Sequence, residues 1–315
     1  MSIILTLPIA KHTIWGGKTL RSFFGFPKHF GNDAGQAWVF SAQQGESSLI
    51  CGSGYNGWTL SKLWEKHPEL FRSRYDHFPF IISLVAPEDD LSIQVHPDES
   101  VARAKGYPSG KNEAWVFLQA PADGHIIYDH CAADQHDLMT YINRNAWMEL
   151  VRTLPVTQGD TVYIPAGTLH ALQKGSIVYE VQQATNVTYR FFDYDRTDAK
   201  GCKRPLQLKE AVACLRYDHP EPELSKPIPS VTQDGPITET VCLQNESFFV
   251  RRFDIRGAGV IQKPMYLLAT LVSGQGIVDG VPVRAGGSFL VPAGEPVCVE
   301  GAFSLLTTAE TQERA

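Results

Sequence analysis

Four side chains that are far apart in the sequence have the types that bind a divalent metal ion. Gln94 and His96 are two positions apart, so on a β-strand their side chains point to the same face. Glu113 and His170 each begin a later expected strand. Two imidazoles, a carboxylate and an amide oxygen suit Zn²⁺, or another divalent ion such as Mn²⁺, Fe²⁺ or Co²⁺, and leave positions open for water or substrate. We therefore predict a metal site formed by these four residues.

Each of these residues also has a simpler interpretation. A lone histidine at the end of a barrel is more often held by an ordinary hydrogen bond, and a lone glutamate more often lies at a solvated strand edge. It is the combination of the four that favours a metal site.

A second group, His125, His130, Cys131 and His136, also contains metal-binding residue types. Its five-residue spacing puts His125 and His130 on opposite faces of a continuous strand, which favours a surface loop without metal.

The segment 159–170, Gly-Asp-Thr-Val-Tyr-Ile-Pro-Ala-Gly-Thr-Leu-His, shows how His170 is positioned. Its apolar residues alternate as in a strand, and Pro165 and Gly167 end that strand and reverse the chain. His170 is thereby expected at the mouth of a small β-barrel, where inward side chains hold ligands. The segment 286–297 repeats the pattern but has Val297 in place of the histidine, which predicts a second barrel with a structural role.

The remaining sequence predicts a mainly β protein with a few short helices. Strands are expected over 37–41, 78–85, 91–96, 113–118, 177–183 and 187–192, and helices over 59–71, 134–151 and 208–215. We interpret residues 97–112 as a loop and the Pro- and Glu-rich segment 219–236 as a linker. This predicts a catalytic domain over residues 1–235 and a second barrel domain over residues 236–315.

Composition limits the classes of function. With 315 residues, 43% hydrophobic and 20% charged, the chain has the composition of a soluble globular protein. A formal net charge of −6 argues against nucleic-acid binding, so we expect a small-molecule substrate. The N-terminus lacks a signal-peptide pattern, no apolar run reaches membrane-spanning length, and the six cysteines form no C-x-x-C pair. These features predict a cytoplasmic protein with reduced thiols.

Five stretches together resemble the type I mannose-6-phosphate isomerases, in their short bacterial form. They extend over about residues 10–210. They are Ile-Trp-Gly-Gly at 14–17, Ser-Ile-Gln-Val-His-Pro-Asp at 92–98, Lys-Asn-Glu-Ala-Trp at 111–115, Pro-Ala-Gly-Thr-Leu-His-Ala at 165–171, and Thr-Tyr-Arg-Phe-Phe-Asp-Tyr-Asp-Arg at 188–196.

The resemblance implies two cupin-type (jelly-roll) β-barrels, the second degenerate and without a metal site. It implies a zinc-dependent aldose–ketose isomerase that interconverts mannose 6-phosphate and fructose 6-phosphate, with one Zn²⁺ per chain. The implied zinc ligands are His96, Glu113 and His170, with Gln94 as a fourth, at a position where short bacterial members often have lysine. The implied catalytic residues are Arg190 and Lys111.

Such an isomerase removes a proton from C2, stabilises an enediolate and returns the proton to C1. A metal with open positions and a fixed cation such as Arg190 can both stabilise the enediolate charge. For the base, the sequence offers Glu180, Asp193 and Asp195, which are all expected on strands, or a metal-bound hydroxide. Each of these carboxylates is equally well interpreted as part of an ion pair at the barrel rim.

Three positions depart from the family pattern and keep other functions in view. Gln36 stands where glutamate is common, Gln43 where histidine is common, and Gln207 replaces the histidine of an Arg-x-Leu-His stretch. One alternative is a non-catalytic, metal-containing cupin that binds a sugar phosphate as a regulator or sensor. Another is a metal-dependent oxygenase on the same barrel, although Lys111 and Arg190 favour a phosphorylated substrate. The sequence does not define the oligomeric state.

Overall fold

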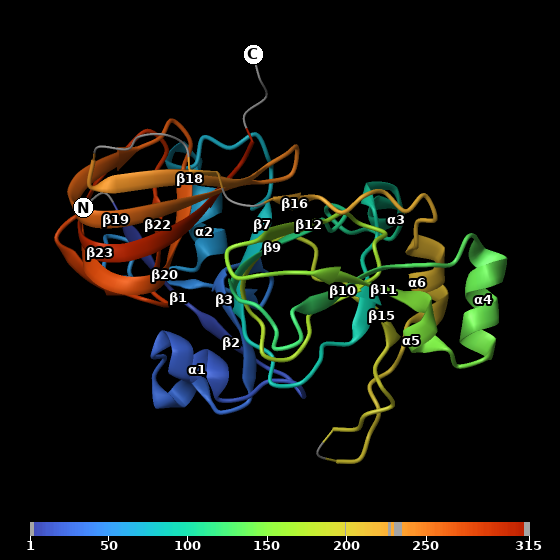
Figure 1. Ribbon diagram of the computed structural model, residues 1–315. Helices are drawn as coiled ribbons and strands as arrows, with labels where there is room; N and C mark the ends of the chain where they lie inside the picture. The colour runs from blue at the N-terminus through green and yellow to red at the C-terminus, as the bar shows by residue number, and fades with distance from the viewer. Residues whose placement is uncertain (1–2, 199, 226–227, 230–234, 312–315) are drawn as a thin grey trace.

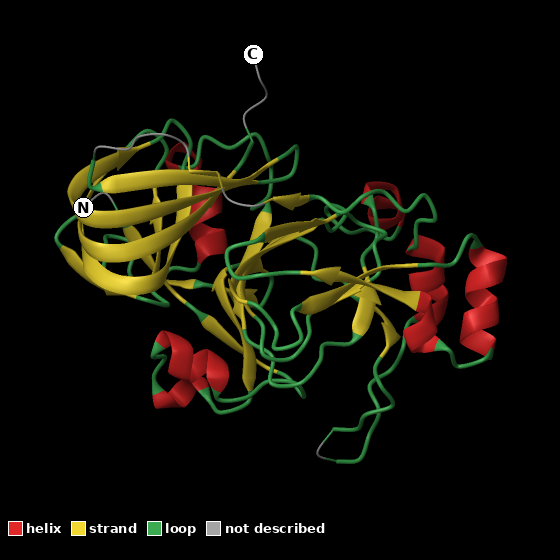
Figure 2. Cartoon of the chain, in the orientation of Figure 1, coloured by secondary structure: helices red, strands yellow, loops and turns green. Residues whose placement is uncertain are grey.

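The protein consists mostly of antiparallel β-sheet with a few short helices, as seen in a computed structural model that describes residues 3–198, 200–225, 228–229 and 235–311 (Figures 1 and 2). This confirms the predicted mainly β class. Within the described residues, no helix is both long and apolar enough to cross a membrane.

The sheet that carries Glu113, here called the Glu113 sheet, lies in the middle of the molecule. Its strand β9 alternates between two cores, because Trp115 and Phe117 face one apolar cluster and Ala114 and Val116 face another. In spatial order the strands are β16 (Leu224–Ser225), β12 (Thr161–Ile164), β9 (Glu113–Gln119), β14 (Ile177–Gln183), β7 (Phe80–Val85), β3 (Ala34–Phe40) and β2 (Ile9–His12).

A second sheet, here called the His170 sheet, approaches the Glu113 sheet on the Trp115 side. Its strands are, in order, β11 (Val151–Pro155), β10 (His125–His130), β13 (His170–Ala171), β8 (Ile93–Val95) and β15 (Tyr189–Phe192). Helix α6 (Leu208–Cys214) packs on β15 and β8, and α4 (Gln135–Asn143) and α5 (Trp147–Leu150) lie at the same end of the molecule (Figure 1). Apolar residues of these helices, among them Leu138, Leu150 and Val212, pack in one cluster with apolar residues of this sheet.

The C-terminal sheet packs against the other face of the Glu113 sheet, through a core that includes Phe40, Tyr179 and Leu268. Its order is β17 (Ile228–Pro229), β18 (Ile237–Gln244), β19 (Phe249–Gln262), β23 (Pro296–Ala309), β20 (Leu267–Val278), β22 (Ser288–Val291), β1 (Ile4–Leu7) and β6 (Leu49–Cys51), with β21 (Val281–Arg284) on β20. Strands β1 and β6 both come from the N-terminal part of the chain. The division into domains at residue 235 stays a prediction, and Val297 packs in the core of this sheet.

The short helices agree with the predictions in most places. Helix α2 (Leu60–Lys66) begins at Thr59, whose hydroxyl accepts a hydrogen bond from the backbone N–H of Lys62 at 3.2 Å. Helices α4, α5 and α6 confirm the helices expected over 134–151 and 208–215.

The interpretation of residues 97–112 as a loop is wrong in part. Helix α3 (Glu99–Ala104) forms there because the Asp98 carboxylate caps its first turn. The elements that were not expected include α1 (Thr19–Phe24), the hairpin of β4 (Ala42–Gln43) and β5 (Glu46–Ser47), and strands β1, β2, β6, β10 and β11. Short 3₁₀ turns occur at Lys28–Phe30 and Pro68–Leu70. The expected linker 219–236 lies partly outside the described residues.

Candidate functional site

Three residues singled out in the sequence lie side by side on the His170 sheet. His170 of β13 and Arg190 of β15 are each paired in register with Gln94 of the intervening strand β8. Because side chains paired in register share a face of the sheet, all three are directed to the same side. The register therefore brings together residues that are up to 96 positions apart in the sequence.

The Glu113 sheet supplies the facing side of the site. The Glu113 carboxylate lies 3.0 Å from Nε2 of His96 through Oε1 and 3.5 Å from Nε2 of His170 through Oε2. One ligand atom from each of these residues lies within 4.8 Å of the others, and all three side chains are buried. Two sheets are thus joined at a cluster of two imidazoles and one carboxylate.

The hydrogen bonds of the two histidines test whether a metal fits this cluster. Nδ1 of His96 donates to the Val187 carbonyl at 2.9 Å, and Nδ1 of His170 donates to the Thr168 carbonyl at 2.8 Å. Because a carbonyl can only accept, Nδ1 of each ring holds the proton and Nε2 presents a lone pair to Glu113.

Nε2 of His170 and Oε2 of Glu113 are buried without a hydrogen-bond partner. A buried lone pair that faces a carboxylate needs a cation between the two groups. The backbone carbonyls that accept from Nδ1 fix both rings, as hydrogen bonds to the other ring nitrogen do in metal-binding histidines. The donor set therefore fits a divalent metal ion.

The protonation states of the cluster also suit a metal ion. Burial, together with the nearby Lys111 ammonium, lowers the pKa of His96 to about 3, so its ring is neutral at pH 7. Burial alone would raise the pKa of Glu113, but Lys111 and His96 hold it well below its usual range. The site therefore presents a neutral imidazole and an ionised carboxylate.

Lys111 and Gln94 take different positions around this cluster. Nζ of the buried Lys111 lies 2.9 Å from Oε1 of Glu113 and 3.4 Å from Nε2 of His96. Gln94 is half-buried next to His170, and its Oε1 accepts a hydrogen bond of 3.4 Å from the Ser92 hydroxyl. Both residues line a cavity of about 160 Å³ that also contains Glu113 and Arg190.

Glu180 is the carboxylate that lies in this cavity without belonging to the histidine cluster. It is paired in register with Ser83 and Trp115, and its oxygens accept hydrogen bonds from the Ser83 hydroxyl at 2.7 Å and from Nε1 of Trp115 at 3.0 Å. Burial, followed by the negative charge of Glu113, raises the pKa of Glu180 to about 7. A carboxyl group with this pKa can accept and return a proton near neutral pH.

The expectation that Asp193 and Asp195 lie on a strand is wrong, because β15 ends at Phe192 and the chain turns. Asp195 is exposed and pairs with Lys203 at 2.6 Å. Asp193 is buried and binds the guanidinium groups of Arg196 and Arg204, with nitrogen–oxygen distances of 2.6–2.9 Å. Although burial would raise the pKa of Asp193, these hydrogen bonds hold it below its usual value.

Two guanidinium groups border the cavity. Arg190 is half-buried and donates to the Pro205 carbonyl at 2.9 Å, while its buried Nε has no hydrogen-bond partner. Arg204 reaches the same cavity and is oriented by Asp193. The sequence reasoning did not assign a site role to Arg204, although its arginine matches the first position of the Arg-x-Leu-His stretch. The cavity thus brings the carboxyl groups of Glu113 and Glu180 together with three cationic side chains, those of Lys111, Arg190 and Arg204.

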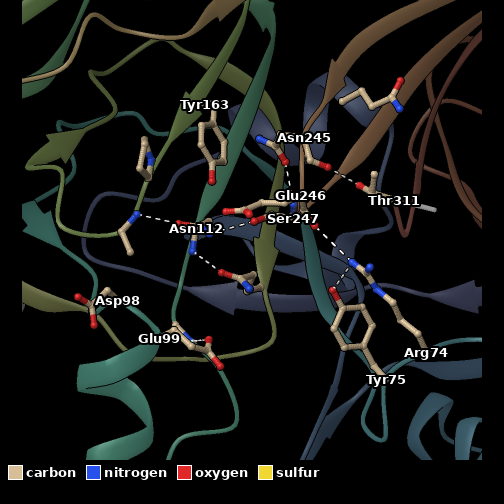
Figure 3. Close-up of a pocket in the computed structure, with 15 residues that line it drawn as sticks. Arg74, Tyr75, Asp98, Glu99, Asn112, Tyr163, Asn245, Glu246, Ser247 and Thr311 are labelled. Carbon is tan, nitrogen blue, oxygen red and sulfur yellow. Dashed lines mark hydrogen bonds between the residues drawn. The ribbon is translucent and has the colours of Figure 1, made fainter. Parts of the chain in front are cut away.

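A larger cleft of about 1050 Å³ lies on the opposite face of the same strands. Asn112 and Gln183 line this cleft, whereas their neighbours Lys111, Glu113 and Gln182 line the smaller cavity, as strand alternation requires. Figure 3 shows Asn112 in the cleft, with Tyr163 and Ser247 nearby. Of the histidine cluster, Glu113 lines the smaller cavity, and no member of the cluster is among the residues that line the cleft.

The group His125, His130, Cys131 and His136 does not come together. His125 and His136 are exposed at separate places, but His130 is fully buried at the end of β10. The expectation of a surface loop is therefore wrong, because His125 and His130 begin and end strand β10 and His136 lies in helix α4. The His130 side chain lies beside Asp129 and His219.

Comparisons with known proteins agree with one another. The family described as phosphomannose isomerase type I, catalytic domain, matches residues 5–121. The mannose-6-phosphate isomerase ManA of Bacillus subtilis is 35% identical over 296 residues, which cover 91% of this chain and 92% of the relative. The mannose-6-phosphate isomerase of Streptococcus mutans is 32% identical over 285 residues, 89% of each chain.

Among solved structures, the mannose 6-phosphate isomerase of Bacillus subtilis superimposes with a TM-score of 0.90 at 34% identity, covering 98% of this chain and 99% of the other. The match extends over both parts of the molecule, and the predicted cupin-type architecture is consistent with it.

Proposed function

The chain belongs to the family of type I mannose-6-phosphate isomerases, and on that premise we propose that it interconverts mannose 6-phosphate and fructose 6-phosphate with one zinc ion bound at the site of His96, Glu113 and His170. The observation that carries the proposal is the buried cluster of His96, Glu113 and His170, whose central residue, Glu113, lines one cavity with Glu180 and Arg190.

His96, Glu113 and His170 would hold the metal ion, with Gln94 as a fourth ligand. When bound, the ion supplies a Lewis acid that polarises the sugar oxygens. The two backbone-anchored imidazoles fix the site before substrate arrives, so binding needs little rearrangement.

Glu180 is our candidate for the proton-transfer group. Its ionised carboxylate takes the proton from C2 of the aldose, and the electron pair of the broken C–H bond forms the C1–C2 double bond while the former carbonyl oxygen O1 takes the negative charge. A proton moves from O2 to O1, and as the C2 carbonyl forms, the same carboxyl group returns its proton to C1 to give the ketose. The hydrogen bonds from Ser83 and Trp115 hold the carboxylate in one orientation during both steps.

The cations of the cavity have separate tasks in this mechanism. Lys111 and Arg190 stabilise the negative charge of the enediolate, because both are fixed and at least half-buried, where water screens charge poorly. Arg204, oriented by Asp193, is available to bind the phosphate group, which a planar guanidinium can contact through two parallel hydrogen bonds. An overall acidic protein can recruit an anionic substrate in this way.

The proposal is tested with zinc-loaded protein and mannose 6-phosphate in D₂O. We expect formation of fructose 6-phosphate, followed in a coupled assay, together with exchange of the C2 proton, followed by NMR. A folded, zinc-loaded protein that binds the sugar phosphate without exchange would instead be the regulator or sensor considered above, and absence of both binding and exchange would reject the sugar phosphate.

The proposed location is the cytoplasm. Hexose 6-phosphates are charged and do not cross membranes unaided, and the six cysteines, all of which lie in the described part of the chain, are unpaired. Separation of cell fractions followed by detection of the protein would test this location.

A further inference from the structure

A second buried group of metal-ligating side chains lies outside the cavity. Asp129 and His130 end strand β10, and His219 comes from the segment after α6, about 90 positions later in the sequence. One ligand atom from each residue lies within 4.8 Å of the others. Asp129 and His130 are buried and His219 is nearly so, with 17% of its side chain exposed.

The hydrogen bonds orient His130 and His219 in the same way, with Nε2 of each ring directed at a backbone carbonyl. Nε2 of His130 faces the Arg216 carbonyl at 3.0 Å, and Nε2 of His219 faces the Ala132 carbonyl at 2.9 Å. Since a carbonyl only accepts, each Nε2 carries a proton and donates it, which leaves Nδ1 of each ring for another partner. Backbone carbonyls hold metal-binding histidines in the same manner.

The Nδ1 atoms have little else to bind. Nδ1 of His130 is buried without a hydrogen-bond partner. Nδ1 of His219 lies 2.8 Å from Oδ2 of Asp129, a contact that needs either a proton or a metal ion between the two atoms. The cluster therefore resembles the cavity site in its chemistry, with two imidazoles and one carboxylate.

The backbone at this cluster is held in an unusual conformation. Asp129 and His219 have positive φ angles of 74° and 42°, in the left-handed region that non-glycine residues rarely adopt. Such backbone strain tends to collect at functional sites. Here it directs two ligand-bearing side chains to one point.

We propose that Asp129, His130 and His219 form a second divalent metal site, which binds Zn²⁺ through the carboxylate and the two Nδ1 atoms. Nitrogen and oxygen donors in this ratio suit zinc, and a water molecule completes four-coordination. A nearby cation, the guanidinium of Arg152, lies 3.8 Å from Oδ2 of Asp129, but its side chain is 49% exposed, so water screens its charge. The guanidinium of Arg216 is neutralised by Asp218.

This second site joins elements that also position the cavity site. The backbone N–H of Asp129 donates to the Leu169 carbonyl, next to His170. The backbone N–H of Arg216 donates to the Gly167 carbonyl, and that of Gly167 donates to the carbonyl of His96. An ion at the second site would therefore connect the segment after α6 to the turn that precedes His170, which is a structural role.

The test counts zinc in the full-length protein. The wild-type protein is expected to retain two zinc ions per chain after gel filtration, and the Asp129→Asn variant one, measured by elemental analysis. Asparagine adopts the left-handed conformation readily, so this variant should fold while losing the charged ligand.

A double variant, His96→Ala with His170→Ala, isolates the second site. It should bind one zinc ion, and zinc should raise its melting temperature; adding His219→Ala should weaken zinc binding at least tenfold. Adding His125→Ala, at an exposed position of the same strand, is the matched control and should leave zinc binding intact.

Two results would overturn the second site. One is a wild-type protein that holds a single zinc ion and loses it when His96 and His170 are replaced. In that case His219 would only share a proton with Asp129. The other is full zinc content in Asp129→Asn and in the His219→Ala variant. Neither result depends on isomerase activity, so the second site can fail while the proposed function stands.

Discussion

The Lys111 ammonium lies 2.9 Å from the Glu113 carboxylate, two residues further along the chain, and both side chains are buried. The buried Glu113 carboxylate, which lies between the imidazoles of His96 and His170, thus already has one fixed cation beside it, the Lys111 ammonium. Because the ammonium contacts only Oε1, Oε2 of Glu113 stays available to a metal ion. In the proposed mechanism, the Lys111 charge is therefore available to the substrate while a metal ion binds through Oε2.

Replacing Lys111 with methionine should separate these two roles. We expect kcat to fall by about 10²- to 10³-fold, the size of effect seen when a charge-stabilising donor is removed from an active site. Zinc content should not fall, because the substitution removes a positive charge that repels the metal. Kinetics and elemental analysis on the same sample check this, and loss of zinc would show that Lys111 supports the metal site instead.

Replacing Arg190 with alanine should remove most activity and leave the protein folded. The guanidinium is half-buried at the edge of the cavity, so kcat should fall by about 10²- to 10³-fold while the melting temperature changes little. The control is Arg256→Ala, at an exposed position on β19. Full turnover by the Arg190 variant would eliminate its assigned role.

The pH dependence should report the ionisation of Glu180. Only the carboxylate accepts a proton, so kcat/KM should rise as pH increases through the pKa of Glu180, which burial raises to about 7. The Ser83 hydroxyl stabilises the ionised form, so Ser83→Ala should raise this pKa and move the acidic limb to higher pH.

A metal ion bound beside Glu180 lowers the pH midpoint of the acidic limb in both the wild-type protein and the Ser83→Ala variant. The difference between these two midpoints is therefore the quantity to measure. Glu180→Gln should abolish turnover at every pH. An unchanged acidic limb in Ser83→Ala would assign the proton transfer to another group.

Removing the metal should abolish activity and lower thermal stability. Ligand binding to the folded state stabilises it by about 2.7 kcal/mol when the free ligand is at 100 times its dissociation constant, so a chelator should lower the melting temperature and added zinc should restore it. A Glu113→Gln variant, which loses the central carboxylate, should need a higher zinc concentration for the same recovery. Full activity after exhaustive chelation would exclude a metal-dependent reaction.

Asn112 should contribute to stability from the face opposite the site. Its Oδ1 accepts a hydrogen bond from the backbone N–H of Ala166 at 2.8 Å, and its Nδ2 donates to the Ser247 hydroxyl at 2.9 Å (Figure 3). Asn112→Ala leaves the Ala166 N–H without this partner and removes one hydrogen bond of the Ser247 hydroxyl, so the free energy of unfolding should fall by about 1–3 kcal/mol. Chemical denaturation measures this, with the exposed Asn143→Ala as control, and equal stability of both variants would contradict the assigned contacts.

Much of the site was predictable because strand alternation is a local property. Gln94 and His96 share a face since they are two residues apart, and the same rule separates Asn112 from Lys111 and Glu113. The turn before His170 was equally predictable. Gly167 has a φ of 85°, and a Cβ atom there would lie 2.9 Å from the Cys214 carbonyl oxygen.

The choice among the candidate bases was not predictable from the sequence. Glu180, Asp193 and Asp195 all follow apolar segments, and only the end of β15 at Phe192 shows that Asp193 turns away to bind two arginines. The raised pKa of Glu180 depends on burial and on Glu113, which is 67 positions away in the sequence.

The amino-acid sequence by itself determined the mainly β class, the faces of the strands and the residue types available for metal and proton chemistry, because these follow from interactions within a few residues. The tertiary structure alone decided which of them meet. Sheet register placed Arg190 and His170 on either side of Gln94, and a contact across about 90 residues joined His219 to Asp129. Such pairings depend on how distant strands and loops pack, which no local pattern records.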